Sequence, residues 1–199
     1  MKRTGAKHKL CRRIGGCVWG DPKCPSVKRP YSAGMHGKAR RRKLSTYGEL
    51  LLEKQKLRAH YALSERQLRF AYKKAQAGTG STAEKLLRHL ELRLATVVWR
   101  SGLTPSIFAA KQAVCHRHVL VDGKTVDRSS YRVRPEQVVS IDPQRSPALA
   151  SVAQKTDIAP PPYIEINKEG VSARIARDPM PDEIPANVEI MRVIEYYAR

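Results

Sequence analysis

Three cysteines and one histidine near the start of the chain have the chemistry of a metal site. His8, Cys11, Cys17 and Cys24 offer one imidazole and three thiolates, and Zn²⁺ is bound by four nitrogen or sulfur ligands in a tetrahedron. The spacing is less regular than that of a doubled Cys-x-x-Cys motif, and His36 is an alternative fourth ligand. The pattern predicts one structural zinc ion, and we expect no other cofactor.

The alternative is that these cysteines are small apolar residues in a loop. An odd number of them in one segment argues against a set of disulfides. Residues 1–46 contain few large hydrophobic side chains, so a fold there needs another source of stability, which a metal would supply. The remaining cysteine, Cys115, lies in a predicted helix and is interpreted as a small packed residue.

The charge of the chain predicts a polyanionic partner. The 199 residues include 38 Lys and Arg against 18 Asp and Glu, a formal net charge of +20. Residues 1–46 carry 14 basic residues and one acidic residue, whereas residues 160–199 carry five and seven. Such an excess opposes compaction unless it is neutralised, so we expect nucleic acid to bind toward the front of the chain.

We find no signal peptide and no membrane-spanning segment in the sequence. No run of residues is long and apolar enough to span a membrane, and no apolar signal-peptide core follows Met1. We therefore expect a cytoplasmic protein with no membrane partner and no homo-oligomer.

Four consecutive cations stand between a glycine-containing turn and a predicted helix. They are Arg40, Arg41, Arg42 and Lys43. Four adjacent residues cannot share one helix face, so the run is interpreted as an extended segment that contacts several phosphates. The alternative is a solvated tether.

Two helices are predicted between residues 47 and 77, and both carry candidate RNA-binding side chains. In the second helix, which Ser64 and Gln67 can cap, the apolar side chains face one way and a basic stripe without acidic residues faces the other. We expect this stripe to contact RNA backbone rather than water alone. The candidates of this section are Arg66, Arg69, Lys73, Lys54 and Arg58.

The next section predicts two further helices. A capping box at Ser81 begins a helix that runs to Gly102, on which Arg93 and Arg100 are seven residues apart and share one face. Thr104 is the predicted N-cap of a second helix that ends near Cys115.

After these helices the pattern changes to strands. Residues 119–126 form a predicted hairpin, because Asp122 and Gly123 suit the positive φ angles of a type I′ turn. Two more short strands are expected at residues 131–133 and 138–141.

Several segments resemble one known family. HRHVLVDGKTVDRSSYRV, residues 116–133, is similar to the small RNA-binding domain called the alpha-L motif, which is named after bacterial small-subunit ribosomal protein S-four. LSTYG at 44–48, EKQK at 53–56 and SERQ at 64–67 also resemble that family, so the resemblance covers nearly the whole chain. The same domain occurs in some RNA-modifying enzymes and in a tRNA synthetase.

The resemblance implies a structural protein of the ribosome, and no enzyme. It implies direct binding to a junction of small-subunit rRNA early in assembly, which nucleates the body of the subunit. It also implies neighbouring ribosomal proteins and a place at the channel through which mRNA enters, with influence on decoding accuracy. We assign Arg40, Arg41, Arg42 and Lys43 to that channel.

The resemblance also carries over to single positions. The positions associated with the RNA face or its support are Arg93, Ser106, Lys111, His116, His118 and Tyr131. Arg117 departs from the small residue usual between the two histidines. Some family members hold zinc in a segment ending in Pro-Lys-Cys, like Pro22 to Cys24 here, and others lack the metal.

These observations define the expected fold, which is α+β. It has a mainly helical N-terminal domain with a basic arm, and an alpha-L RNA-binding domain of two helices and a small, mostly antiparallel sheet. The expected divisions are a basic arm at 1–46, a helical rRNA-binding domain at 47–90, the alpha-L domain at 91–142, and a linker, sheet extension and scaffold segment at 143–199.

Two other classes of protein compete with this interpretation. An RNA-modifying or tRNA-related enzyme would need a further catalytic core, and no catalytic constellation of Asp, His, Ser or Cys is found after residue 142. A zinc-bearing DNA regulator is disfavoured, because neither a helix-turn-helix nor a regular zinc-finger spacing is found.

Overall fold

The computed structural model describes residues 6–39, 43–156, 158–167, 169 and 171–199. The chain divides into two compact units, one of residues 1–72 with 186–199 and one of residues 73–185. Among the described residues, no helix has the length and apolar character needed to cross a membrane. The mixture of helices with one small antiparallel sheet confirms the predicted α+β class.

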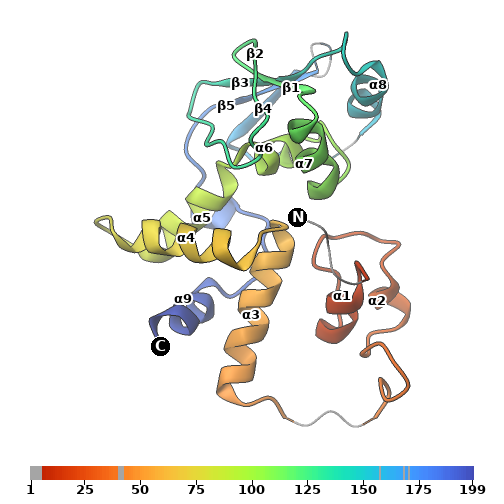
Figure 1. The fold of residues 1–199 in the computed structure, drawn as a ribbon, viewed down its shortest axis with the longest axis vertical. Helices are drawn as coiled ribbons and strands as arrows, with labels where there is room; N and C mark the ends of the chain where they lie inside the picture. Colours follow the sequence, from red (N-terminus) through yellow and green to blue (C-terminus); the bar gives the residue numbers. More distant parts are fainter. Residues whose placement is uncertain (1–5, 40–42, 157, 168, 170) are drawn as a thin grey trace. The chain divides into compact units, whose positions relative to one another are not determined.

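The first unit is helical. Its helices are α1 (Lys9–Ile14), α2 (Pro25–Lys28), α3 (Thr46–His60), most of α4 (Glu65–Gln76) and α9 (Ile190–Ala198). α9 packs along α3 although the two are far apart in the sequence (Figure 1). Leu57, Leu68 and Val193 are completely buried, one from each of α3, α4 and α9.

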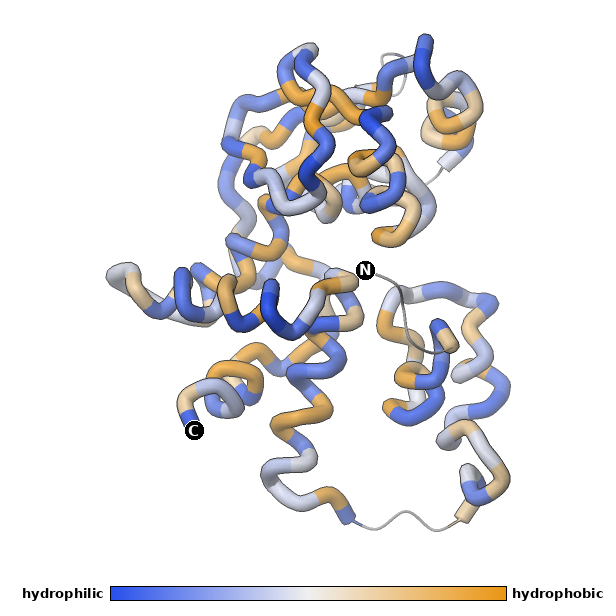
Figure 2. Tube along the Cα trace, viewed as in Figure 1, coloured by the Kyte–Doolittle hydropathy of each residue, from blue (hydrophilic) through white to orange (hydrophobic). Residues whose placement is uncertain are grey.

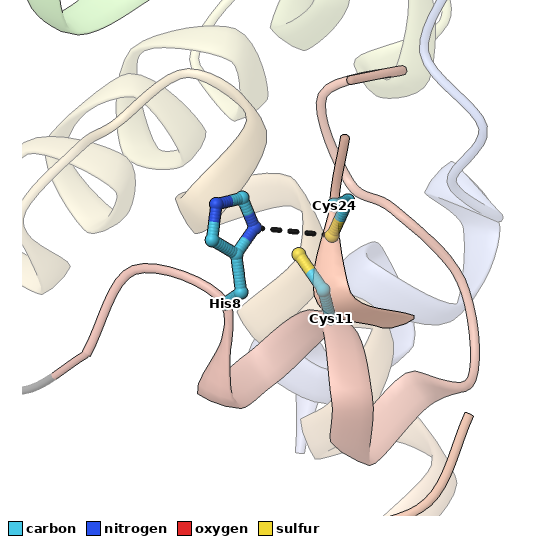
Figure 3. Close-up of side chains that lie close together, drawn as sticks. All are labelled: His8, Cys11 and Cys24. Carbon is cyan, nitrogen blue, oxygen red and sulfur yellow. Dashed lines mark hydrogen bonds between the residues drawn. The ribbon is translucent and has the colours of Figure 1, made fainter. Parts of the chain in front are cut away.

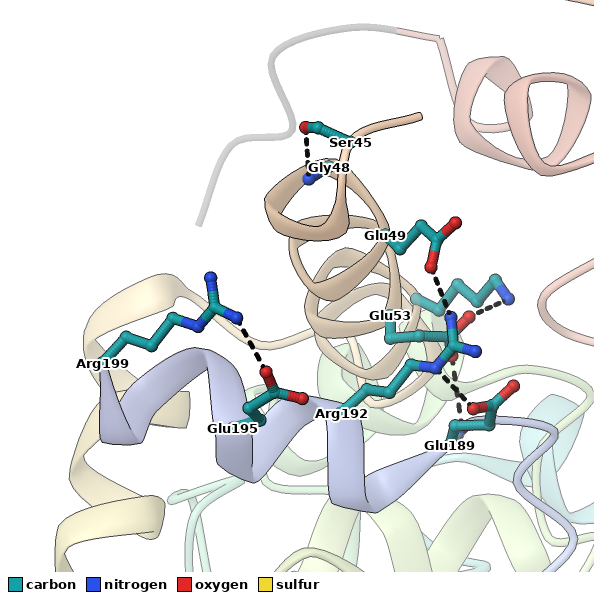
Figure 4. Close-up of polar contacts among 9 residues, drawn as sticks. Ser45, Gly48, Glu49, Glu53, Glu189, Arg192, Glu195 and Arg199 are labelled. Carbon is teal, nitrogen blue, oxygen red and sulfur yellow. Dashed lines mark hydrogen bonds and ion pairs between the residues drawn. The ribbon is translucent and has the colours of Figure 1, made fainter. Parts of the chain in front are cut away.

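Charged residues join α3 to the segment around α9. Arg192 Nη1 lies 3.3 Å from Glu49 Oε2, and the Glu189 backbone amide donates to Glu53 Oε2 at 3.2 Å (Figure 4). Glu53 is buried, so its carboxylate needs such donors. The last residues of the chain are therefore part of the helical unit, which the sequence alone did not indicate.

Side-chain caps begin both long helices of this unit. Ser45 Oγ accepts from the Gly48 amide at 3.2 Å, one turn into α3 (Figure 4). At α4, Ser64 Oγ accepts from the Gln67 amide at 3.2 Å and Gln67 Oε1 accepts from the Ser64 amide at 3.1 Å. The reciprocal pair is the predicted capping box.

The second unit combines helices with a five-stranded sheet. The helices are α5 (Thr82–Glu91), α6 (Leu94–Arg100), α7 (Ile107–Cys115) and α8 (Pro147–Lys155), with a 3₁₀ turn η1 (Pro181–Glu183). The strands are β1 (Val119–Val121), β2 (Lys124–Thr125), β3 (Val138–Ile141), β4 (Ile164–Asn167) and β5 (Ser172–Ile175). Their order is β2-β1-β3-β5-β4, and every pairing is antiparallel.

The buried residues of this unit come mainly from the sheet and from the helices α5, α6 and α7. The alternate residues Val119 and Val121 are buried, as are Val139 and Ile141 on the neighbouring strand. In Figure 2, hydrophobic and hydrophilic residues are interspersed along the strands of this unit. The period-2 pattern therefore directs one face of each strand inward.

The predicted helix from Ser81 to Gly102 is wrong, because it is two helices. Arg93 has an extended backbone (φ −73°, ψ 134°) between α5 and α6. Here the chain pairs with residues 131–133: the Leu94 amide donates to the Tyr131 carbonyl at 2.8 Å, and the Val133 amide to the Leu92 carbonyl at 2.9 Å. These tertiary hydrogen bonds replace the helical ones, and the predicted strand at 131–133 is only this bridge.

Of two predictions for the segment that follows α6, one is wrong and one is confirmed. The predicted N-cap Thr104 is wrong, because Ser106 Oγ accepts from the Ala109 amide at 3.2 Å and caps α7 instead. The predicted type I′ hairpin is confirmed, since Asp122 (φ 49°) and Gly123 (φ 76°) both lie in the left-handed region.

The last third contains more structure than the predicted linker. α8 occupies residues 147–155, and its buried face consists of Ala150 and Ala153. β4 and β5 extend the sheet beside β3, as predicted. The boundary between the two units lies at residues 72 and 73, whereas divisions were expected at 46, 90 and 142. Residues 186–199 belong to a different unit from the rest of 143–199.

Candidate RNA interface and candidate metal centre

Three of the four predicted zinc ligands meet in the basic arm. His8, Cys11 and Cys24 each place a ligand atom within 4.8 Å of the other two. His8 Nδ1 lies 3.0 Å from Cys24 Sγ, and the Cys11 thiol points into the same space (Figure 3). Cys11 and Cys24 are 0% and 2% exposed. One nitrogen and two sulfurs at this separation fit three corners of a zinc tetrahedron.

Burial of these side chains is the strongest argument that they are structural. Within the described residues 6–39, the buried residues are Cys11, Cys24, Ser26 and Gly37. The arm thus has no large hydrophobic core, and its two most buried reactive groups are thiols that face an imidazole. Burial, followed by the neighbouring Cys24 and Cys17, raises the pKa of Cys11 to about 11.

Neither candidate for the fourth ligand, Cys17 or His36, belongs to this group of three residues. Cys17 is half-buried, and its thiol interacts with those of Cys11 and Cys24 without joining the three close atoms. His36 is exposed and also lies outside the group. Cys115, predicted to be packed, is exposed at the end of α7. The prediction of Cys115 as a packed residue is therefore wrong.

The arm is attached to α3 through polar contacts. Trp19 Nε1 donates to the Ala59 carbonyl at 3.0 Å, and His60 Nδ1 lies 3.0 Å from the Val18 carbonyl oxygen. Arg12 holds the arm itself together, since its Nε and Nη2 donate to the carbonyls of Tyr31 and Ser32 at 3.1 and 3.2 Å. The segment that contains the candidate metal ligands is thus joined to α3 by the Trp19 side chain and the Val18 carbonyl.

The predicted basic stripe lies on the exposed side of α4. Arg66, Arg69 and Lys73 are all exposed, whereas Leu68, Tyr72 and Ala75 on the opposite side are buried. The helix therefore presents these cations to solvent, as the 3.6-residue period predicted.

Lys54 is not available to RNA, which corrects the sequence-based assignment. Its side chain is buried, its Nζ lies 3.0 Å from Glu65 Oε1, and it sits 4.5 Å from the centroid of the Tyr196 ring. Arg58 is half-buried, and its Nη1 lies 4.0 Å from Glu65 Oε2. Lys54 belongs to the packing of α3 against α4 and α9, because a buried ammonium needs these partners.

Two cations of the second unit are partly withdrawn from water and close together. Burial and then the charge of Arg93 lower the pKa of Lys111, on α7, to about 8. Burial also lowers the pKa of Arg93, whose Nη2 is buried and has no hydrogen-bond partner among the described residues. Two partly buried positive charges near one another repel, and an approaching phosphate would offset that repulsion.

The other positions given by the resemblance surround the start of the hairpin. His116 is exposed and His118 half-buried, with ring centroids 6.0 Å apart, and His118 Nδ1 is buried without a hydrogen-bond partner among the described residues. Ser106 supports the site as the cap of α7. Tyr131 is half-buried and fixes α6 through its backbone carbonyl.

Arg117 shows why a small residue is usual at its position. Its φ of 63° is left-handed, at the residue that follows the end of α7, where glycine is strongly favoured. The side chain points to solvent and pairs with Asp127, Nη2 to Oδ2, at 3.2 Å. Arg117 therefore carries a backbone strain that glycine would not.

Arg100 is the largest correction to the predicted interface. It is 8% exposed, and its Nη2 and Nε lie 3.0 and 3.3 Å from the carboxylate of Glu91, which is fully buried. The break at Arg93 changes the helix face, so the seven-residue spacing no longer places Arg93 and Arg100 together. Arg100 is a core ion pair and no RNA contact.

Sequence reasoning missed Arg132, which is exposed and forms a backbone bridge with Arg93. Burial and then the positive charges of Arg132, Lys74, Arg88 and Lys85 lower the pKa of His89 to about 4. The region around α5 therefore has a strongly positive field. The only signal in the sequence was the basic residue count, because the bridge joins positions almost forty residues apart.

A basic helical unit and a small sheet domain with desolvated cations define an RNA-binding protein of the S4-domain class. Family models match residues 2–91 as the ribosomal protein S4/S9 N-terminal domain and residues 92–139 as the S4 domain. The chain belongs to the uS4 family of small ribosomal subunit proteins. The family consists of structural proteins, so the enzyme alternative is set aside.

The similarity extends over the full chain. The chain is 41% identical to small ribosomal subunit protein uS4 of Bifidobacterium animalis subsp. lactis, in an alignment that covers 99% of this chain and 98% of the relative. It is 42% identical to uS4 of Ruegeria pomeroyi and 44% identical to uS4 of Beutenbergia cavernae, covering 100% of this chain and 98% of each relative. The boundary between the two family models lies at residues 91 and 92.

Proposed function

We propose that the chain binds small-subunit rRNA directly and early in assembly, and that it nucleates the body of the subunit. It lies beside neighbouring ribosomal proteins near the channel through which mRNA enters, and it contributes to decoding accuracy there. It acts in cytoplasmic ribosomes as a single copy, and the bound RNA neutralises its net charge of +20.

The observation that carries this proposal is the close pair Arg93 and Lys111. A cation that burial has partly stripped of water gains more from a phosphate than a fully hydrated one does. The exposed stripe of Arg66, Arg69 and Lys73 on α4 supplies ordinary, hydrated contacts to the same kind of backbone. We thus assign the positioning of the RNA to Arg93 and Lys111 of the S4 domain, and additional affinity for RNA to the stripe on α4.

The proposal is tested by the pH dependence of RNA binding. The lowered pKa of Lys111, about 8 in the free protein, rises when phosphate binds, so binding takes up a proton above that pH. Affinity for small-subunit rRNA is therefore expected to fall from pH 7 to pH 9, by at most about tenfold per pH unit. The measurement is the Kd at pH 7, 8 and 9.

Variants at the same position provide the control. Lys111→Arg keeps its charge throughout this range, so its affinity should stay tight and nearly independent of pH. Lys111→Met should bind more weakly and lose the pH dependence. A Met variant with the wild-type pH profile would contradict the assignment.

The role at the mRNA channel rests on consecutive cations. Arg40, Arg41 and Arg42 lie outside the described residues, and Lys43, which is described, is exposed. Exposure and charge favour contact with a mobile phosphate backbone. The proposal for these four residues therefore rests on their sequence and on the family.

We further propose that the arm holds one structural zinc ion through His8, Cys11 and Cys24, with Cys17 as the fourth ligand. The close donor atoms, the burial of both thiols and the absence of another core among residues 6–39 support it. When bound, zinc would fix the arm by joining α1 to the segment before α2. Hydrogen bonds within the arm, such as those from Arg12 to the Tyr31 and Ser32 carbonyls, would then hold its basic residues in place.

A further inference from the structure

Phe70 is an exposed aromatic side chain in the middle of the basic side of α4. It is 69% exposed, whereas Leu68 and Tyr72 of the same helix are 0% and 6% exposed. No ring of another described residue stacks on it. The chain has only two phenylalanines, and this one contributes nothing to the core.

Cations surround this ring on the helix surface. With about 100° between successive residues, Arg66 and Lys74 lie about 40° to either side of Phe70 and Lys73 about 60° away, one turn along the helix. All three are exposed. No acidic residue lies within one helical turn of Phe70. The nearest one in α4 is Glu65, at the start of the helix.

A single exposed apolar residue is normal on a protein surface and needs no explanation by itself. An exposed planar ring flanked by cations is different, because proteins that bind unpaired RNA combine these two features. The ring stacks on the face of a base, while the cations neutralise the phosphates on both sides of that nucleotide. A protein partner would have to be acidic as well as apolar to fit the same surface.

We propose that Phe70 is a stacking platform for one unpaired nucleobase of the bound rRNA, with Arg66 and Lys73 holding the adjacent phosphates. The inference rests on the proposed direct binding to small-subunit rRNA and adds a contact that carries no charge. Stacking does not release counterions, so its contribution is independent of salt, whereas that of Arg66 weakens as salt rises.

The test compares variants of the full chain on protein-free small-subunit rRNA at two salt concentrations. Phe70→Ala and Phe70→Leu should both weaken binding by roughly 5- to 100-fold, by the same factor at both concentrations, because leucine keeps apolar area but has no aromatic face. Phe70→Tyr should bind like the wild type. Arg66→Met should instead lower the slope of affinity against salt.

Met191→Ala is the matched control. Met191 is 67% exposed on α9 and has no ring, so this variant should bind like the wild type. Because Phe70 is exposed, its variants should also unfold at the wild-type denaturant concentration, which separates a lost contact from a lost fold.

Three results would overturn the stacking inference. Wild-type affinity of Phe70→Ala would remove the contact. Wild-type affinity of Phe70→Leu with weak binding of Phe70→Ala would indicate an apolar contact and not stacking. Normal binding of both to rRNA, with a defect only when other ribosomal proteins are present, would indicate a protein partner. If the wild type itself fails to bind protein-free rRNA, the proposed function fails first.

Discussion

Replacing Arg100 with methionine is expected to lower the free energy of unfolding by about 3–5 kcal/mol, because it leaves a buried carboxylate uncompensated. Glu91 is completely buried and accepts from Arg100 Nη2 at 3.0 Å and from the Tyr163 hydroxyl at 2.9 Å. Burial, and then the charge of Glu91, raises the pKa of Tyr163 above its usual range, so that hydroxyl remains a donor. It cannot replace the missing positive charge.

The measurement is denaturant unfolding of the second unit. Each unit contains one of the two tryptophans, so Trp99 fluorescence in a Trp19→Phe background reports on the second unit. Adding Glu91→Gln to Arg100→Met should recover much of the loss, because the buried charge is then gone. The exposed Arg69→Met should change stability by less than about 0.5 kcal/mol. An Arg100→Met effect as small as that would contradict the role of the pair.

Purified chain is expected to contain about one zinc ion, and Cys24→Ser should reduce this to near zero, because Cys24 lies beside both His8 and Cys11. Structural zinc sites bind with apparent free energies of about 10–16 kcal/mol, so the wild type should keep its zinc during purification, whereas the variant, which lacks one ligand, should lose it to a chelator. The arm should then become sensitive to protease, since two of the four buried residues among 6–39 are the thiols Cys11 and Cys24.

Cys115→Ser is the matched control for zinc content, because this exposed cysteine lies in the other unit and should not affect the metal. Cys17→Ser and His36→Ala identify the fourth ligand: the first should weaken zinc binding and the second should not. Metal-free wild-type protein whose arm resists protease as well as before would disprove the zinc proposal.

Local patterns predicted the elements whose stability is local. The capping box of Ser64 and Gln67, the hairpin turn at Asp122 and Gly123, and the amphipathic period of α4 each depend on residues within a few positions of one another. Three of the four candidate metal ligands lie close together, because their types are rare in the chain and they stand in one short segment.

Long-range contacts account for what the sequence did not reveal. The break at Arg93 comes from pairing with Arg132, and it changes which side chains face outward, so Arg100 was misassigned. Lys54 was misassigned because its partner, Glu65, belongs to the next helix. Alanine-rich α8 has the composition of a linker, and only its packing distinguishes it from one.

The most direct test of the central claim is the affinity of the purified chain for protein-free small-subunit rRNA as a function of salt. If about five of the exposed or partly desolvated cations each neutralise a phosphate, log Kd should change with log salt with a slope of about 4. Binding should saturate at one chain per rRNA and weaken a few hundred-fold between 50 and 200 mM, on the order expected for that slope. An affinity that is independent of salt, or equal for unrelated RNA of the same length, would contradict the account.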